Sequence, residues 1–314
     1  MSRAKSSGEL AGNFAKVRLS KMEVIRRMAE GLYLEFPEQW VPDATGYVLD
    51  EWQKNIIRKL FIGNNPPPGA DIFSWYPEKK ARLSLRAAHS CGKTFMASIL
   101  THFFLCNYLP SRVAITGPTG KQTKSQVWNY IQTVWSRSVF RDDIEMYGTT
   151  MKFRESPAEW FATWLTSKEP RSIEGFHGPN DGENLLWIVE ESKTVADAVF
   201  EAIQGALSNE HCYWYISSTC GSASGFFFDT FHSKQSLWEN TKVTYKDSSR
   251  ISLDQIRKWE QSWGRDSSIF KARALAEFPE EDDKILVPLS WCERAIRQPQ
   301  NDEDIYDEDI QEAA

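Results

Sequence analysis

Cysteine is scarce in this sequence, and none of it lies in a metal-binding or disulfide pattern. Five Cys occur in 314 residues, and no two of them have the Cys-X-X-Cys spacing of zinc sites and redox motifs. This scatter excludes a disulfide-stapled scaffold and is typical of reduced thiols. Long apolar runs are absent too, since the longest, near 99–109, is far shorter than the roughly 20 residues that span a bilayer. No segment resembles a signal peptide, so we expect a cytoplasmic chain with no membrane partner.

The sequence has no excess of positive charge either. Its 37 Lys and Arg residues face 43 Asp and Glu residues, which gives a net charge of −6. Overall charge therefore cannot bind nucleic acid, and any DNA contact must come from a local basic face. One such face is predicted in residues 1–30, which carry seven Lys and Arg by position 27. This N-terminal arm, expected to be partly disordered, is either a DNA or partner contact or a solvated basic first helix.

The most informative stretch is the loop at 86–94, Arg-Ala-Ala-His-Ser-Cys-Gly-Lys-Thr. An alternating apolar strand at 81–85 precedes it and an apolar helix at 95–109 follows it, which is the context of a phosphate-binding loop. Amides at such a helix N-terminus bind phosphate oxygens, the lysine reaches the β- and γ-phosphates of ATP, and the threonine hydroxyl ligates Mg²⁺. The predicted nucleotide-binding residues of the loop are Ala88, His89, Ser90, Cys91, Gly92, Lys93 and Thr94.

Three residues of this loop raise separate questions. Ala87 stands where the motif usually has its first glycine, and an alanine can make that turn if its φ stays negative. His89 is either a ligand of the phosphates or a packing residue, and the sequence favours neither. Cys91 is a small residue that fits beside Gly92, and we expect its alkylation to block ATP binding.

Two carboxylates follow a second buried strand, at 185–192. Its unbroken apolar run is typical of a strand that is covered on both faces of a parallel sheet. Glu190 is predicted to hold Mg²⁺ through a water molecule, and Glu191 to orient and deprotonate the attacking water. The alternative is an acidic strand end that is exposed to solvent.

Further residues complete the predicted site. The strand at 212–217 ends in Ser218-Thr219, where a γ-phosphate sensor would lie, although such pairs are also common in turns. Arg171, in a glycine-rich loop before the carboxylate strand, is predicted to supply the positive charge that stabilises the transition state. The alternatives to it are Arg137, Arg141 and Arg154.

The alternation of strands and helices predicts an α/β fold. We expect a P-loop NTPase of the catalytic-glutamate, RecA-like branch, with a mainly parallel central sheet flanked by helices. A helix at 49–61 precedes the phosphate loop, and in it Gln53 either offers its amide to adenine or lies on the helix surface. We divide the chain into the basic arm, an ATPase domain at 31–277, a linker at 278–300 and a tail at 301–314. The tail carries seven carboxylates and no basic residue, so we expect it to be disordered.

The motifs come in a characteristic order. They are Trp52-Gln53, the loop at 86–94, Thr116-Gly117-Pro118-Thr119 with Gln122 and Gln126, Glu174-Gly175-Phe176-His177, Val189-Glu190-Glu191-Ser192, Ser224-Gly225-Phe226-Phe227 and Ala276-Glu277-Phe278-Pro279. Between residues 40 and 296 this order resembles the large subunit of tailed-phage terminases, the genome-packaging motor.

The resemblance implies an ATPase that drives double-stranded DNA into a procapsid, as a homo-oligomeric ring on the portal protein in the cytoplasm of the infected bacterial host. It implies a small terminase subunit as a partner, places Gln53 at the adenine, and assigns Ser218-Thr219 to coupling hydrolysis to movement. Glu190 and Ser192 replace the family's usual Asp and Ala. Family members normally continue into a nuclease domain, but the Asp residues of the acidic tail lie in no apolar strands, so we expect no nuclease site in this chain.

Two other functions fit part of the pattern. A helicase-type DNA-remodelling ATPase would share the glutamine motif and the strand end at 116–119, but it needs a second motor domain, for which we expect no room in this chain. A low-turnover nucleotide-binding assembly module is the other alternative, because Glu190 stands in place of the usual aspartate.

Overall fold

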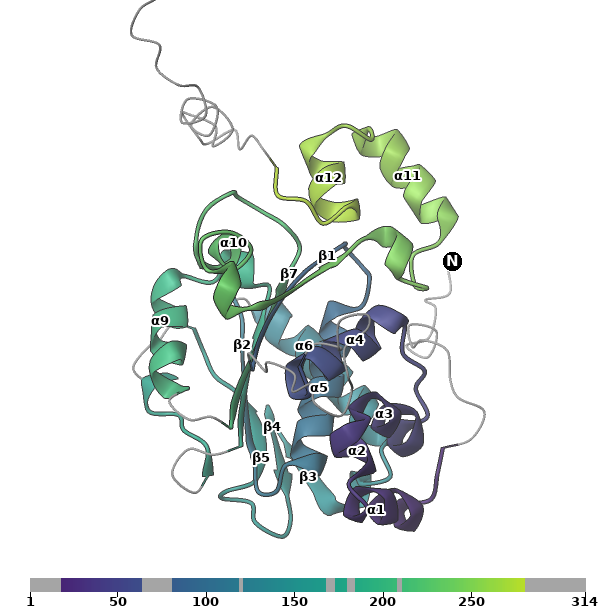
Figure 1. Ribbon diagram of the computed structural model, residues 1–314, viewed down its shortest axis with the longest axis vertical. Helices are drawn as coiled ribbons and strands as arrows, with labels where there is room; N and C mark the ends of the chain where they lie inside the picture. The colour runs from purple at the N-terminus through teal and green to yellow at the C-terminus, as the bar shows by residue number, and fades with distance from the viewer. Residues whose placement is uncertain are drawn as a thin grey trace, which may run out of the picture.

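The computed structural model describes residues 18–63, 81–118, 121–167, 173–179, 184–207 and 211–279. Their centre is an eight-stranded sheet with helices on both faces (Figure 1). The strand order is β3-β4-β5-β2-β6-β7-β1-β8, in which the neighbours from β5 through to β8 are parallel and β3 and β4 add an antiparallel edge. The strands are β1 Arg82–Ala87, β2 Arg112–Thr116, β3 Ile144–Tyr147, β4 Thr150–Phe153, β5 Phe161–Trp164, β6 Leu185–Glu190, β7 Cys212–Ser218 and β8 Glu239–Val243.

Helices α3 to α6 cover one face of the sheet, and α9 and α10 cover the other (Figure 1). The helices are α1 Lys21–Ala29, α2 Leu32–Glu35, α3 Pro37–Thr45, α4 Glu51–Phe61, α5 Lys93–Asn107, α6 Lys121–Arg137, α9 Asp197–Ala206, α10 Phe226–Asp229, α11 Leu253–Trp263 and α12 Ser268–Ala274. Short 3-10 turns are η1 Arg141–Asp143, η2 Ser192–Thr194, η3 Gln235–Leu237 and η4 Tyr245–Asp247. No helix in this described part of the chain is long and apolar enough to cross a membrane.

The position of β6 in the middle of the sheet explains why its sequence is apolar without a break. All of its residues are buried, and they alternate between the two cores: Leu186 and Ile188 pack with α3 to α6, whereas Trp187 and Val189 pack with α9 and α10. A strand covered on both faces has no polar side to show. Helix α5 is apolar nearly all round for the same reason, because it lies between the sheet and other helices and only Thr94 and Asn107 escape full burial.

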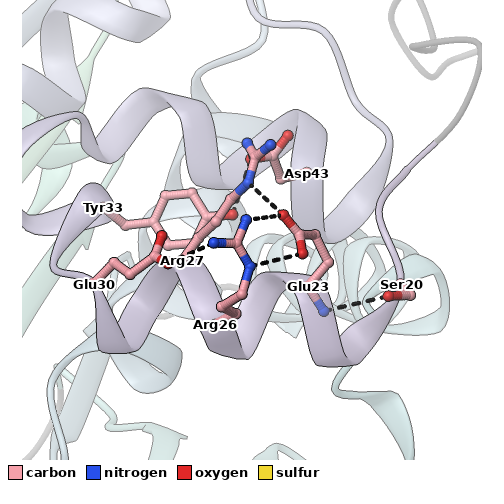
Figure 2. Close-up of polar contacts among 7 residues, drawn as sticks. All are labelled: Ser20, Glu23, Arg26, Arg27, Glu30, Tyr33 and Asp43. Atoms are coloured by element: carbon pink, nitrogen blue, oxygen red, sulfur yellow. Dashed lines mark hydrogen bonds and ion pairs between the residues drawn. The ribbon is translucent and has the colours of Figure 1, made fainter.

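The predicted fold class is confirmed, with differences at the ends of the chain's elements. The basic first helix that we expected in the N-terminal arm ends before Gly31. The φ of 76° at Gly31 interrupts the α-helical path, and α2 begins after it. Helix α3 was not predicted, and Asp43 within it accepts hydrogen bonds from Arg27 at 2.8 Å and from Tyr33 at 2.9 Å, which fasten α1 and α2 to it (Figure 2). Strand β3 was not predicted either.

The carboxyl ends of three parallel strands meet at one edge of the sheet. In the strand registers Arg86 of β1 lies opposite Ser218 of β7, and Glu190 of β6 lies opposite Ser217. The loops that leave these ends therefore adjoin one another, and helices α11 and α12 lie beyond the same edge (Figure 1). This edge is where ligands bind in open parallel sheets.

Candidate nucleotide-binding and catalytic site

The phosphate loop turns from β1 into α5 through two residues in the left-handed region. Ser90 has a φ of 62° and Gly92 a φ of 106°. A side chain is strained at the larger value, so the glycine before the lysine is required there. Ala87 is the last residue of β1 and needs no such freedom. The loop therefore closes without the motif's usual first glycine.

Helix α5 presents an uncapped N-terminus to this loop. It begins at Lys93, with Gly92 as its N-cap, which has no side chain to cap the first turn. Lys93 is only 6% exposed, and its Nζ lies 3.5 Å from the Ala88 carbonyl oxygen, at the limit of a hydrogen bond. The Lys93 ammonium thus lies over its own loop against a weak acceptor, at the N-terminal end of α5 where phosphate binding requires a cation and helix amides.

Glu190 is buried at the end of β6, and each of its carboxylate oxygens accepts a hydrogen bond from a hydroxyl group. Thr94 Oγ1 donates to one oxygen at 3.1 Å, and Ser217 Oγ donates to the other at 2.6 Å. Burial raises the pKa of Glu190 to about 7, and the neighbouring charge of Glu191 acts in the same direction, while the two hydrogen bonds oppose it. The structure therefore brings the predicted metal pair, Thr94 and Glu190, into direct contact.

This pair fits Mg²⁺ bound together with a nucleotide. Magnesium in such sites takes one or two protein oxygens and completes its shell with phosphate oxygens and water. Within the residues that the structure describes, no cluster of three or more His, Cys, Asp or Glu side chains could hold a metal ion by itself. Thr94 and Glu190 would thus supply part of a metal shell, which phosphate oxygens and water would complete.

Glu191 follows directly, but its surroundings differ from those of Glu190. Its backbone is left-handed, with φ 50° and ψ 45°, a costly conformation for a side chain other than glycine and one that is common at functional sites. The turn leaves Glu191 half-buried, and its Oε2 accepts a hydrogen bond from Ser218 Oγ at 3.3 Å. The predicted base can therefore meet a water molecule, whereas its neighbour is sealed in the sheet.

The end of β7 is linked to both carboxylates. Ser217 binds Glu190, Ser218 binds Glu191, and Thr219 accepts a hydrogen bond from Lys193 Nζ at 2.6 Å. The sensor role predicted for Ser218 and Thr219 stays a prediction. Ser217 and Lys193 were missed, although the parallel register of β6 and β7 places Ser217 opposite Glu190.

Gln53 is buried, only 2% exposed, so it does not lie on the helix surface. Its Oε1 accepts the amide of Asp50 at 3.0 Å, in a capping box that starts α4. Its Nε2 is buried and has no hydrogen-bond partner among the described residues. The adenine contact stays a prediction, and the capping bond restricts it to that nitrogen.

Residues that sequence reasoning did not single out hold the phosphate loop from beyond the sheet. Ser248 Oγ donates to the Cys91 carbonyl at 3.1 Å, and the His89 amide donates to the Arg273 carbonyl at 2.7 Å. The Arg250 guanidinium lies 4.4 Å from the centre of the Phe95 ring. Both ends of the α11–α12 segment therefore touch the loop.

Several other predicted residues have mixed outcomes. The side chain of His89 remains exposed, which leaves its ligand role open. Cys91 is fully buried and burial raises its pKa, so its alkylation is expected to be slow. Arg171 lies outside the described residues. Of its alternatives, Arg141 and Arg154 form ion pairs at the β3–β4 edge, and Arg137 lies over the ring of Tyr47.

Sheet, loop and carboxylates together define an α/β P-loop NTPase fold. No protein-family model matches the chain. In sequence it is 25% identical over 226 residues to a probable terminase large subunit of Enterobacteria phage P7, an alignment that covers 68% of this chain and 46% of that protein. The chain thus spans about half the length of this relative.

Solved structures of phage terminases have the same fold. The large terminase of a thermophilic bacteriophage has a TM-score of 0.55 at 9% identity, covering 74% of this chain and 54% of that one. A mutant ATPase domain of the Thermus phage P74-26 large terminase has a TM-score of 0.54 at 16% identity, with coverages of 76% and 97%. The large terminase of bacteriophage HK97 has a TM-score of 0.54 at 17% identity, and the match covers 78% of this chain and 54% of that one. The predicted resemblance to phage terminase large subunits is confirmed.

Proposed function

We propose that this chain hydrolyses ATP as the DNA-translocating motor subunit of a phage genome-packaging terminase. The observation that carries the proposal is the contact of Thr94 with Glu190 at 3.1 Å, between Lys93 of the phosphate loop and Glu191 of the carboxylate strand. Nucleotide binding is supported by the large terminase of the thermophilic bacteriophage, for which structures with ADP and with ATP-γ-S are known. The P7 relative supports the terminase assignment.

In this proposal Lys93 and the amides from Ser90 to Thr94 bind the β- and γ-phosphates, because the amides of Ala88 and His89 already donate to the carbonyl oxygens of Val243 and Arg273. Thr94 and Glu190 hold Mg²⁺, which neutralises phosphate charge when it is bound, Glu190 acting through a water molecule. Glu191 accepts a proton from the water that attacks the γ-phosphorus, which requires a half-exposed carboxylate.

The remaining parts link hydrolysis to movement. Ser218 and Thr219 sense the γ-phosphate at the end of β7 and pass the change to DNA-contacting surfaces. Arg171 supplies positive charge to the transition state, and Gln53 contacts the adenine. The ATPase domain extends over 31–277, between the basic arm at 1–30 and the segments at 278–300 and 301–314.

The proposed partners follow from the family. They are double-stranded DNA, the portal protein, the small terminase subunit and further copies of this chain in a ring on the portal. The proposed location is the cytoplasm of the infected bacterium.

The test is ATP hydrolysis by Glu191→Gln. The substitution removes the base and keeps the shape of the side chain, so we expect kcat to fall about 10²- to 10⁴-fold while ATP still binds. Glu201→Gln, at an exposed position of α9, is the matched control and should follow the wild type. Phosphate release and equilibrium binding of a fluorescent nucleotide measure the two effects.

Hydrolysis that is equal in wild type and Glu191→Gln would remove the assigned base. Absent hydrolysis in a wild type that binds ATP would favour the low-turnover assembly module. Separation of DNA strands by the isolated chain would favour the helicase-type ATPase.

A further inference from the structure

Lys193 reaches from the turn after β6 to the end of β7. Its Nζ donates to Thr219 Oγ1 at 2.6 Å, and the carbonyl oxygen of Cys220 lies 3.5 Å away. Its stem passes Gly221, where a Cβ would come within 2.9 Å of Lys193 Cδ. The glycine therefore leaves the space that the lysine stem occupies. An ammonium group is thus held beside the strand ends that carry Glu191 and the predicted sensor.

The partners of this ammonium are uncharged. An ammonium has three donor positions, and the Thr219 hydroxyl uses one of them in a short hydrogen bond. Within the described residues no carboxylate forms an ion pair with Lys193, which keeps part of its surface exposed to solvent. Its positive charge is therefore available to an anion that enters the site.

Other cations lie near enough to act on Lys193. Partial burial lowers the pKa of Lys193, the charge of Glu191 raises it, and the charges of Lys93 and Arg273 lower it further. Three cations thus lie close enough to repel one another: Lys93 of the phosphate loop, Lys193 of the turn after β6 and Arg273 of α12. Repulsion of this kind is relieved by a polyanion.

We propose that Lys193 is a further catalytic cation of this site, in addition to Lys93 and Arg171. It contacts the γ-phosphate of bound ATP from within the same chain and releases Thr219 when it does so. The inference rests on the proposed ATPase function. A charged phosphate oxygen is a stronger acceptor than a neutral hydroxyl, so the ammonium moves its hydrogen bond to the γ-phosphate. ADP lacks that phosphate and leaves the bond to Thr219 in place.

This exchange makes the end of β7 respond to the state of the nucleotide. Lys193 stays protonated throughout and transfers no proton; it stabilises negative charge on the γ-phosphate oxygens. Thr219 is free in the ATP state and bound in the ADP state. The predicted sensor segment thus acquires a defined signal.

The experiment compares ATP-γ-S with ADP in Lys193→Met, which keeps most of the stem and removes the charge. We expect ATP-γ-S affinity to fall about 10-fold, as for a lost charge-assisted hydrogen bond, while ADP affinity changes less than about twofold. In single-turnover hydrolysis of ATP the rate should fall about 10²-fold. Lys193→Arg, which retains a donor and a charge, should recover part of both losses. Lys258→Met, on the exposed side of α11, is the matched control, and circular dichroism verifies folding.

Equal weakening of ATP-γ-S and ADP would overturn the inference, because Lys193 would then only support the loop. Unchanged binding and hydrolysis in Lys193→Met, with an active wild type, would overturn it and leave the proposed ATPase standing. A wild type that binds ATP-γ-S without hydrolysing ATP would remove the ATPase, and the ratio of the two affinities would still decide the γ-phosphate contact. A wild type that binds neither nucleotide would overturn both.

Discussion

Two polar networks of this protein pair their charges in different ways. On α1 the Glu23 carboxylate binds Arg26 at 2.6 Å and Arg27 at 3.3 Å, and Arg27 also binds Asp43 (Figure 2). The hydrogen bond from Arg26 lowers the pKa of Glu23 to about 2. At the strand ends Glu190 accepts hydrogen bonds from the hydroxyls of Thr94 and Ser217 and forms no ion pair among the described residues, and its pKa is raised to about 7 by burial.

This difference in charge pairing distinguishes a network that holds helices together from a binding site. In the α1 network each charge has an opposite charge beside it, so the network is complete and serves to hold helices together. At the strand ends the buried Glu190 carboxylate and the exposed Lys193 ammonium each hydrogen-bond a neutral hydroxyl, and for the buried carboxylate a missing counter-charge is costly. The proposed metal ion and phosphate would supply the missing charges. On this proposal the site favours its ligand at the expense of the ligand-free fold.

Glu190→Gln tests this trade-off most directly, and we expect it to have the largest effect. Hydrolysis should fall about 10²-fold or more, since the carboxylate proposed to hold the metal through a water molecule is lost. The ligand-free protein should become more stable by about 1 to 2 kcal/mol at pH 8, because a buried carboxylate that forms no ion pair among the described residues is replaced by a neutral amide that can still hydrogen-bond both hydroxyls. Phosphate release and urea unfolding measure the two quantities.

A variant that hydrolyses normally and is less stable would break the comparison, since Glu190 would then belong to the fold and not to the site. Glu201→Gln serves again as the exposed control.

His102 sharpens the comparison, because it is a buried titratable group far along α5 from any proposed ligand. Burial lowers its pKa to about 4; its Nδ1 hydrogen-bonds the Ser98 carbonyl at 2.8 Å, and its Nε2 has no partner among the described residues. Unfolded histidine titrates near 6.5, so the neutral ring stabilises the fold above that pH, and this contribution is lost as the pH falls from 6.5 towards 4. The full loss is about 3 kcal/mol.

His102→Leu should therefore flatten the loss of unfolding free energy between pH 7 and pH 4. Urea unfolding at several pH values measures it, with His211→Leu at an exposed position as the control. Equal pH profiles for wild type and His102→Leu would show that the ring is protonated without cost.

The sequence predicted those parts of the fold and site that are local. The phosphate loop, β6 with its two carboxylates and the apolar α5 are each specified by consecutive residues, and the structure places them together. Helix α3 was not predicted, although Pro37 at its start is a residue that commonly begins helices; Pro42 lies inside it.

The missed site residues share a different cause. Ser217, Lys193, Ser248 and Arg273 act through hydrogen bonds to residues on other elements. Their roles depend on strand register and on how α11 and α12 fold back over the loop, which no local pattern encodes. Only the register of β6 against β7 could have been inferred, and it would have found Ser217 alone.

Glu23→Gln should have the smallest effect and so tests the other half of the comparison. Its partners are the exposed Arg26 and the partly exposed Arg27, and in contact with water an ion pair contributes little and salt screens it. We expect Tm to change by about 1 °C or less, the change to vanish in about 1 M salt, and ATP hydrolysis to stay the same. Asp43, which is less exposed and binds both Arg27 and Tyr33, offers the contrast, and Asp43→Asn should cost more. If Glu23→Gln lowered Tm more than Asp43→Asn did, and salt did not reduce that loss, the exposed ion pairs would carry the attachment of α1. Complete pairing of charges would then no longer distinguish a network that holds helices together from a binding site.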